Sequence, residues 1–195
     1  MKQLLAFSFC FLFFQLALCQ HYYSNIIVVQ ASVYKLVKPA IDDLQLQLTK
    51  STRVKFSIIK SDSLYKTGIQ IVKLDPIKDS IFDKRLNPSN DDNFLLISNG
   101  KTNLKIISYT EQGIINGVYT FLDTLGFRWY HPGELWAHTP KLKDVRLKCN
   151  NLFAPDFVLR SFFGTWGVPR NPIVDKANYV NVQWWMWTYR NRFGG

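Results

Sequence analysis

The stretch NFLLISNGKTNLKIISYTEQGIINGVYTFLDTLGFRWYHPGE, residues 93–134, contains two strand patterns, a turn and a helix pattern in direct succession. FLLIS and LKIIS are short runs rich in apolar and β-branched residues, as strands are. Between them lies SNGKTN, in which Asn99 and Gly100 tolerate the positive backbone angles of a hairpin turn. We therefore expect a β-hairpin here, followed at once by a helix.

The helix that follows the hairpin is defined by its apolar spacing. Its apolar residues recur every three or four positions and fall on one face: Ile114, Val118, Phe121, Leu122 and Leu125. Thr110 is placed to cap the first turn, with Tyr109 placed to pack on Ile114 across it. Gly126 is expected to end the helix. Gly117 lies inside it, which indicates a close approach to another element, the sheet in our interpretation.

The region before the hairpin alternates between strand and helix patterns. NIIVVQ (25–30) predicts a buried strand, and RVKFSIIK (53–60) and GIQIVKL (68–74) predict two more. Ser32 is placed to cap a helix whose apolar stripe comprises Val33, Leu36, Val37, Ala40, Ile41, Leu44 and Leu48. Pro39 implies that this helix starts near Lys38 or kinks there. The β-α-β-β-β-β-α-β order predicts an α/β fold, a two-layer mixed sheet with helices on one face.

Residues 93–140 resemble a known accessory domain. The hairpin, the LKIIS strand, the T-x-x-G opening, the GVYTFLDTLG helix and the RWYHPGE ending are similar to the N-terminal domain that precedes the catalytic barrel in family 67 α-glucuronidases and family 20 β-hexosaminidases. The chain looks closest to secreted bacterial proteins that join this domain to a barrel-like region. The resemblance implies an accessory domain over residues 20–150 and the start of a truncated catalytic (β/α) barrel over 151–195.

The first 19 residues, MKQLLAFSFCFLFFQLALC, have the pattern of a cleaved secretory signal peptide. Cleavage after Cys19 would leave Gln20 as the N-terminus of a secreted or periplasmic protein without a membrane span; lipid attachment at Cys19 and a retained anchor are the alternatives. Cys149 would then be the only cysteine, so no intramolecular disulfide is expected. At the end of the apolar alternation in VRLKC, it is expected to be a packed side chain rather than a nucleophile.

The chain is basic, with 24 Lys and Arg against 14 Asp and Glu, a formal charge of +10. These basic residues are scattered and often alternate with apolar ones, as on the solvent face of half-buried strands. We therefore expect no nucleic-acid partner. An acidic polysaccharide or another anionic surface fits a secreted basic protein better.

The segment RWYHPGELWAHTP, residues 128–140, contains candidate metal ligands, but an expected turn keeps them off a common helix face. Pro132 and Gly133 predict a turn, so His131, Glu134 and His138 cannot stack on one helical face as a zinc site would require. No metal and no cofactor are expected, because phosphate loops, dinucleotide fingerprints and C-x-x-C pairs are absent from the sequence. The aromatic residues Trp129, Tyr130 and Trp136 are expected to pack in the core or between domains.

The tail after Asn151 contains four of the six tryptophans and reads as an extended segment followed by a helix that reaches the terminal glycines. A strand and a helix are how a β/α barrel begins. In the resemblance to family 20, PDFVLR matches the start of the first barrel strand, which implies that Arg160 contacts a sugar; a salt bridge is the alternative. We predict four substrate-binding residues: Arg160, Trp166, Trp187 and Arg190.

No catalytic residue is predicted within the chain. Most glycosidases use two carboxylates, and the only glutamates, Glu111 and Glu134, both lie in the expected accessory domain. We therefore expect the N-terminal portion of a secreted glycoside hydrolase acting on O-glycosidic bonds of a carbohydrate substrate, with the catalytic carboxylates in the remainder of the barrel. The alternatives are a non-catalytic carbohydrate-binding or surface protein, and an interaction protein that uses its aromatic tail.

Overall fold

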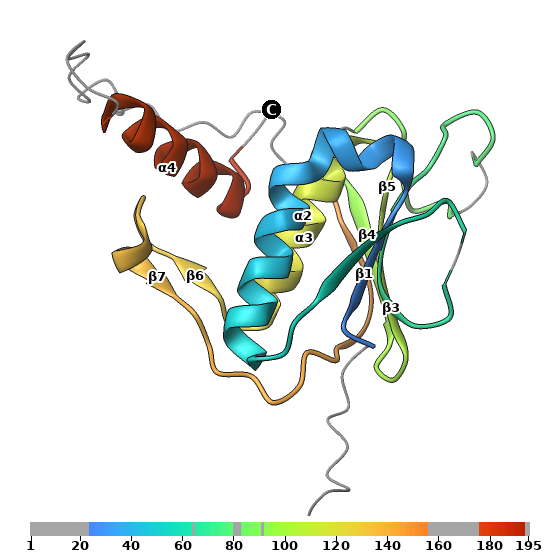
Figure 1. Ribbon diagram of the computed structural model, residues 1–195. Helices are drawn as coiled ribbons and strands as arrows, with labels where there is room; N and C mark the ends of the chain where they lie inside the picture. Colours follow the sequence, from blue (N-terminus) through green and yellow to red (C-terminus); the bar gives the residue numbers. More distant parts are fainter. Residues whose placement is uncertain (1–23, 64, 80–82, 91, 156–175, 194–195) are drawn as a thin grey trace, which may run out of the picture.

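The computed structural model describes residues 24–63, 65–79, 83–90, 92–155 and 176–193. Its centre is one six-stranded sheet (Figure 1). The sheet strands are β1 (Ile26–Val29), β2 (Ser57–Lys60), β3 (Gly68–Lys73), β4 (Phe94–Asn99), β5 (Asn103–Ser108) and β8 (Lys148–Phe153). The predicted signal peptide lies outside the described residues, and none of the described helices is long and apolar enough to cross a membrane.

The sheet is mixed, with the strand order β2-β1-β3-β5-β4-β8. Strands β2, β1, β3 and β5 run parallel, whereas β4 is antiparallel to both of its neighbours. The predicted hairpin is β4–β5, in register from Leu95 opposite Ile107 to Ser98 opposite Leu104. At its tip the Asn99 carboxamide accepts hydrogen bonds from two backbone N–H groups, and Gly100 has φ of 73°. The α/β class and the mixed sheet are confirmed.

Helix α2 (Ala31–Thr52) covers the sheet with its apolar stripe, buried at Val33, Val37, Ala40, Ile41, Leu44 and Leu48. Leu36, predicted to belong to the stripe, is instead 60% exposed. The predicted cap at Ser32 is wrong: the N-cap is Gln30, and the Asp62 carboxylate accepts a hydrogen bond from the N–H of Ala31. The helix runs through Pro39, which is exposed, and Figure 1 shows α2 bending sharply in its first half, as a proline inside a helix favours.

Helix α3 (Glu111–Thr124) has the predicted ends. The Thr110 hydroxyl accepts a hydrogen bond from the N–H of Gly113 at 3.0 Å. At the C-terminus, Gly126 has φ of 98° and its N–H donates to the backbone carbonyl of Asp123. The N–H of Phe127 donates to the carbonyl of Leu122, and these two bonds form a Schellman motif. Gly117 faces the sheet so closely that a Cβ there would lie 2.4 Å from Ile106 Cγ2, as its position in the pattern predicts.

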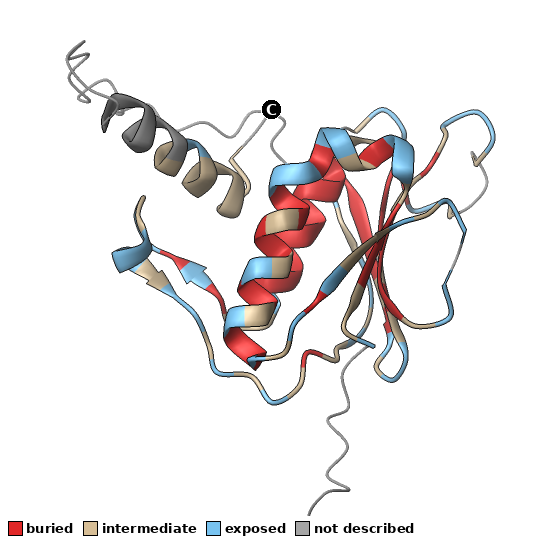
Figure 2. Cartoon of the chain, in the orientation of Figure 1, coloured by how far each residue is buried: buried red, intermediate tan, exposed pale blue. Residues whose placement is uncertain are grey.

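The main hydrophobic core lies between α2, α3 and one face of the sheet, so both helices cover the same face. Figure 2 shows α3 buried along most of its length, because the sheet lies on one side of it and α2 on another. A smaller cluster lies on the opposite sheet face and contains Leu74, Leu86, Leu95, Ile107 and Tyr109. The predicted contact of Tyr109 with Ile114 is therefore not formed, because Ile114 belongs to the main core.

The chain leaves α3 through a short ribbon and returns to the sheet edge. The ribbon consists of β6 (Arg128–Trp129), a 3-10 turn η1 (Glu134–Trp136) and β7 (Ala137–His138), and we call it the β6–β7 arm. The chain then reaches β8, where Cys149 packs on the main core and burial raises the pKa of its thiol. This agrees with the prediction of a packed cysteine.

The last described element is α4 (Lys176–Arg190), which confirms the predicted helix in the tail. It packs beside α3 and the β6–β7 arm (Figure 1). The strand predicted after Pro155 lies outside the described residues. Within the part of the chain that the structure describes, no barrel is formed, and the architecture consists of the six-stranded sheet, three helices and the β6–β7 arm.

Candidate functional site

The first part of the candidate site is the surface on which α4 packs against the β6–β7 arm, and we call this contact surface the seat of α4. The backbone carbonyl of Trp129 accepts two hydrogen bonds, from the Trp187 indole N–H at 3.0 Å and from the Asn191 side chain at 3.1 Å. Trp129 itself is only 6% exposed and packs edge-on against Tyr119 of α3. The arm thus joins α4 to the helix layer.

Arg190 fixes the end of α4 to α2 through an ion pair. Its Nε and Nη2 atoms donate to the two Asp43 carboxylate oxygens at 2.8 and 2.9 Å. The two side chains are 10% and 4% exposed, so the pair is buried. Asp43 also accepts hydrogen bonds from Tyr119 and Gln47, while the guanidinium lies 5.3 Å from the Trp129 ring. The Asp43 carboxylate therefore accepts hydrogen bonds from three different side chains.

Burial and the charge of Asp43 have opposite effects on the pKa of Arg190 and the same effect on the pKa of Tyr119. Burial lowers the pKa of Arg190, but its hydrogen bonds to Asp43 and the attraction of that carboxylate outweigh burial and raise the pKa above its ordinary value. Burial also raises the pKa of Tyr119 well above its usual value, and the Asp43 charge adds to this. Tyr119 therefore stays protonated and remains a donor to Asp43 at neutral pH.

The four predicted substrate-binding residues fall into two groups. Arg160 and Trp166 lie outside the described residues. Trp187 and Arg190 lie together in the seat of α4, where their polar hydrogens bind Trp129 and Asp43. Their contact with a sugar stays a prediction, while their contact with the helix layer is a structural finding.

The second part of the candidate site is a pocket of about 480 Å³ beside α3. Its walls come from the start of β4, one face of α3, the end of β8 and the turn after α4. The lining residues are Asp92, Phe94, Asn116, Thr120, Asp123, Phe153, Ala154, Pro155, Asn191, Arg192 and Phe193. Pockets of this size with aromatic walls and a few fixed polar groups are typical small-molecule sites.

The aromatic wall of the pocket is built from two stacked rings. Phe94 and Phe153 lie with their centroids 4.9 Å apart and their planes 10° apart. They meet because β4 and β8 are paired with these two residues opposite each other. A third ring, Phe193, packs on Trp187 of α4 at 5.4 Å. The pocket is thus joined directly to the seat of α4.

The polar groups of the pocket are held in defined positions. Asn116 donates to the Asp92 carboxylate at 2.8 Å and accepts from Gln112 at 3.1 Å. Asp123 forms an ion pair with Arg128 at 2.7 Å and lies 3.7 Å from Arg192. Each carboxylate therefore already accepts from a protein donor. An arrangement of donors and acceptors beside aromatic rings can bind hydroxyl groups.

These pocket residues were not predicted from the sequence. Asn116 and Thr120 lie on the polar side of a helix pattern, where such residues usually face solvent. The RNRFGG ending contains the other lining residues of the turn, Asn191, Arg192 and Phe193. Its basic residues indicate only the C-terminus of a helix. The sequence signal that could have located the site is Phe193, an aromatic residue just after a helix pattern rich in tryptophan.

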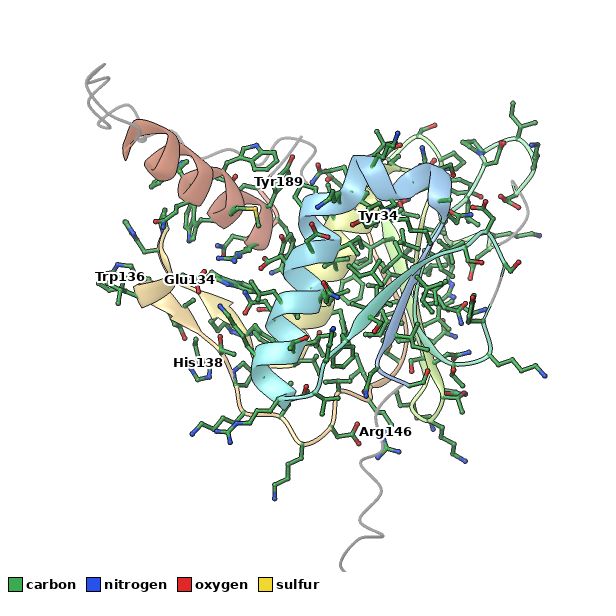
Figure 3. All side chains as sticks on the ribbon, in the orientation of Figure 1. Tyr34, Glu134, Trp136, His138, Arg146 and Tyr189 are labelled. Carbon is green, nitrogen blue, oxygen red and sulfur yellow. The ribbon has the colours of Figure 1, made fainter. Side chains whose placement is uncertain are left out.

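The outer part of the β6–β7 arm exposes aromatic side chains. Tyr130 is 71% exposed and Trp136 is 57% exposed, so among the described residues core packing is shown for Trp129 alone, and packing of the other two between domains stays a prediction. Figure 3 shows Trp136, Glu134 and His138 on this arm, with Trp136 at its outer end. His131 bridges Trp136 and Trp184 at centroid distances of 5.7 and 6.2 Å. Among the described residues, no three acidic, His or Cys side chains form a group that could bind a metal.

No protein-family model matches this chain, and no curated protein is significantly similar to it.

Proposed function

We propose that this chain is the N-terminal portion of a secreted glycoside hydrolase that acts on O-glycosidic bonds of an oligosaccharide or polysaccharide. In this proposal, residues 20–150 are an accessory domain like that of family 67 and family 20 enzymes, and residues 151–195 start the catalytic barrel. The catalytic carboxylates belong to later barrel strands. The α/β architecture with a hairpin, a packed helix and an aromatic ribbon is compatible with it.

The observation that carries the proposal is the contact between the RWYHPGE segment and α4. Trp129 accepts hydrogen bonds from Trp187 and Asn191, and its ring lies beside the Arg190 guanidinium. Glu134, the last residue of the segment, lies 3.7 Å from Arg190. The residues that carry the family resemblance are thus the ones on which α4 rests. This contact supports the interpretation of the segment as a junction between an accessory domain and the first helix of a catalytic unit.

Two preparations test this proposal: the 195-residue chain and the longest natural protein that contains it. Both are incubated with a panel of plant, microbial and animal polysaccharides, and released reducing ends are measured. Hydrolysis by the longer protein and none by the chain alone is the expected result. A longer protein that includes further β/α units and releases no reducing ends from any substrate contradicts the proposal.

The second candidate is a non-catalytic carbohydrate-binding protein, and the pocket beside α3 favours it. Its two carboxylates are held by Asn116 and Arg128, which positions their oxygens to accept hydrogen bonds from ligand hydroxyl groups. Binding of a glycan by the chain, together with no hydrolysis by either preparation, supports this candidate over the first.

A further inference from the structure

The turn after α4 contains an arginine in a conformation that glycine adopts more easily. The N–H of Arg192 donates to the Tyr189 carbonyl at 2.9 Å, and that of Phe193 donates to the Thr188 carbonyl at 2.9 Å. These two bonds define a Schellman motif, whose central position is usually glycine. Arg192 occupies that position with φ of 59°, a left-handed conformation that costs free energy for residues with a Cβ. The cap itself does not need an arginine.

The left-handed turn directs the Arg192 side chain to α3, at the pocket. Its Nη1 donates to the Thr120 hydroxyl at 3.4 Å and lies 3.7 Å from the Asp123 carboxylate. Thr120, Asp123 and the two neighbours of Arg192 in the turn all line the same pocket. The strained residue is therefore placed where its guanidinium can meet a ligand.

The charges around the pocket balance. Two carboxylates, Asp92 and Asp123, line it, and two guanidiniums, Arg192 and Arg128, lie beside Asp123 at 3.7 and 2.7 Å. A phosphate or carboxylate ligand would be repelled by the two acids, and a cation by the two arginines. A neutral ligand rich in hydroxyl groups meets neither penalty.

We propose that this pocket binds a neutral pyranose sugar through two neighbouring hydroxyl groups, with Arg192 as a specificity-determining donor. Arg192 and Asp123 present a donor and an acceptor side by side, which matches a vicinal diol. The aromatic wall of Phe94, Phe153 and Phe193 faces the apolar C–H side of the ring. The volume of about 480 Å³ fits one or two sugar units. This inference rests on the carbohydrate function proposed above and names the ligand class of the pocket.

Arg192→Gly is the decisive variant, because glycine suits the left-handed position and removes the guanidinium without disturbing the cap. Arg53→Gly is its matched control. Arg53 is also left-handed, with φ of 61°, at the C-cap of α2, but it does not line the pocket. Both variants should melt no lower than the wild type. Asp123→Asn, which keeps the side-chain shape, tests the acceptor independently.

The full chain is titrated with the methyl α- and β-glycosides of glucose, galactose, mannose and xylose, and with inorganic phosphate. Calorimetry measures affinity, and amide resonances locate the binding. At least one glycoside is expected to bind with a dissociation constant on the order of 1 mM and to shift the resonances of Asn116, Thr120 and Asn191. Arg192→Gly and Asp123→Asn should weaken it by about tenfold or more, and Arg53→Gly should not.

The inference is overturned if none of the glycosides shifts these resonances, if phosphate binds in their place, or if Arg192→Gly binds as tightly as the wild type. The hydrolysis assay on the longer protein is a separate measurement. Hydrolysis without glycoside binding in the pocket would retain the proposed function and reject the pocket. Failure of both would reject both.

Discussion

Arg190 of α4 and Asp43 of α2 are 147 residues apart in sequence and form a buried ion pair through two hydrogen bonds, at 2.8 and 2.9 Å. Because Tyr119 of α3 also donates to Asp43, one carboxylate connects all three helices. The two side chains are 10% and 4% exposed, so loss of one partner leaves the other charge buried without its ion pair. This cluster is where we expect the attachment of α4 to be most sensitive to mutation.

Asp43→Ala is expected to lower the free energy of unfolding by about 3–5 kcal/mol, the usual effect of breaking a buried pair. Arg190→Ala should cost less, because Asp43 keeps its hydrogen bonds from Tyr119 and Gln47. Urea denaturation of both single variants and the double variant gives the coupling energy. Asp42→Ala is the matched control, since this neighbouring carboxylate pairs with exposed Lys38. An equal loss in the Asp42 and Asp43 variants would contradict the buried pair.

Gly117→Ala should destabilise the protein although alanine is the better helix former. The new Cβ would lie 2.4 Å from Ile106 Cγ2 and 3.1 Å from the Phe94 ring, so α3 would have to move away from the sheet. Overpacking of this kind costs about 1–3 kcal/mol, more than the helix propensity gained. Denaturant midpoints measure the loss. In an Ile106→Ala background the same substitution should cost less, and an equal cost in both backgrounds would show that the contact is not responsible.

The elements of the sheet and helix layer could be predicted because each has its own periodicity. The hairpin at Asn99 and Gly100, the Thr110 cap and the close approach at Gly117 all follow from local chemistry. The errors at Ser32 and Leu36 have separate causes. Asp62, a residue distant in sequence, binds the first N–H of α2. Leu36 lies at the edge of the apolar stripe and is exposed, whereas Val33 and Val37 on either side of it in the stripe are buried.

The candidate site could not be predicted in the same way, because distant parts of the chain assemble it. Phe94 meets Phe153 only through the pairing of β4 with β8, and Arg192 meets Thr120 only after α4 has packed beside α3. Tryptophan and arginine in the tail suggested sugar contacts, yet Trp187 and Arg190 bind protein partners. Composition alone directed the prediction to the tail, whereas tertiary packing decides which side chains line the pocket.

Stability should fall in acid partly through Glu111. Its carboxylate lies 2.5 Å from Lys73 Nζ, and this hydrogen bond lowers the pKa of Glu111 below its ordinary value of 4.5 against the opposing effect of burial. A lowered pKa stabilises the fold above pH 4.5, and the contribution disappears as pH falls through the folded value. Since both side chains are about one-third exposed, the pair contributes under about 1 kcal/mol.

Lys73→Met removes the cation that holds this pKa down. Denaturation of the wild type and the variant between pH 7 and pH 3 should show a small difference in unfolding free energy at neutral pH that shrinks in acid. Lys78→Met is the control, because Lys78 is 83% exposed and lies 3.8 Å from its partner Asp75. A difference between Lys73→Met and the wild type that stays constant with pH would contradict this assignment.

The aromatic end of the β6–β7 arm should make the chain associate. Leu135 is 97% exposed and Trp136 is 57% exposed, and the contacts of His131 extend this apolar surface to Trp184 of α4. Contiguous apolar surface of this kind promotes association. The double variant Leu135→Ser/Trp136→Ser is expected to shift the protein to monomer in light scattering at high concentration. Ile77→Ser is the control, because Ile77 is 88% exposed on a loop outside this surface. A wild-type protein that stays monomeric at every concentration would contradict the prediction.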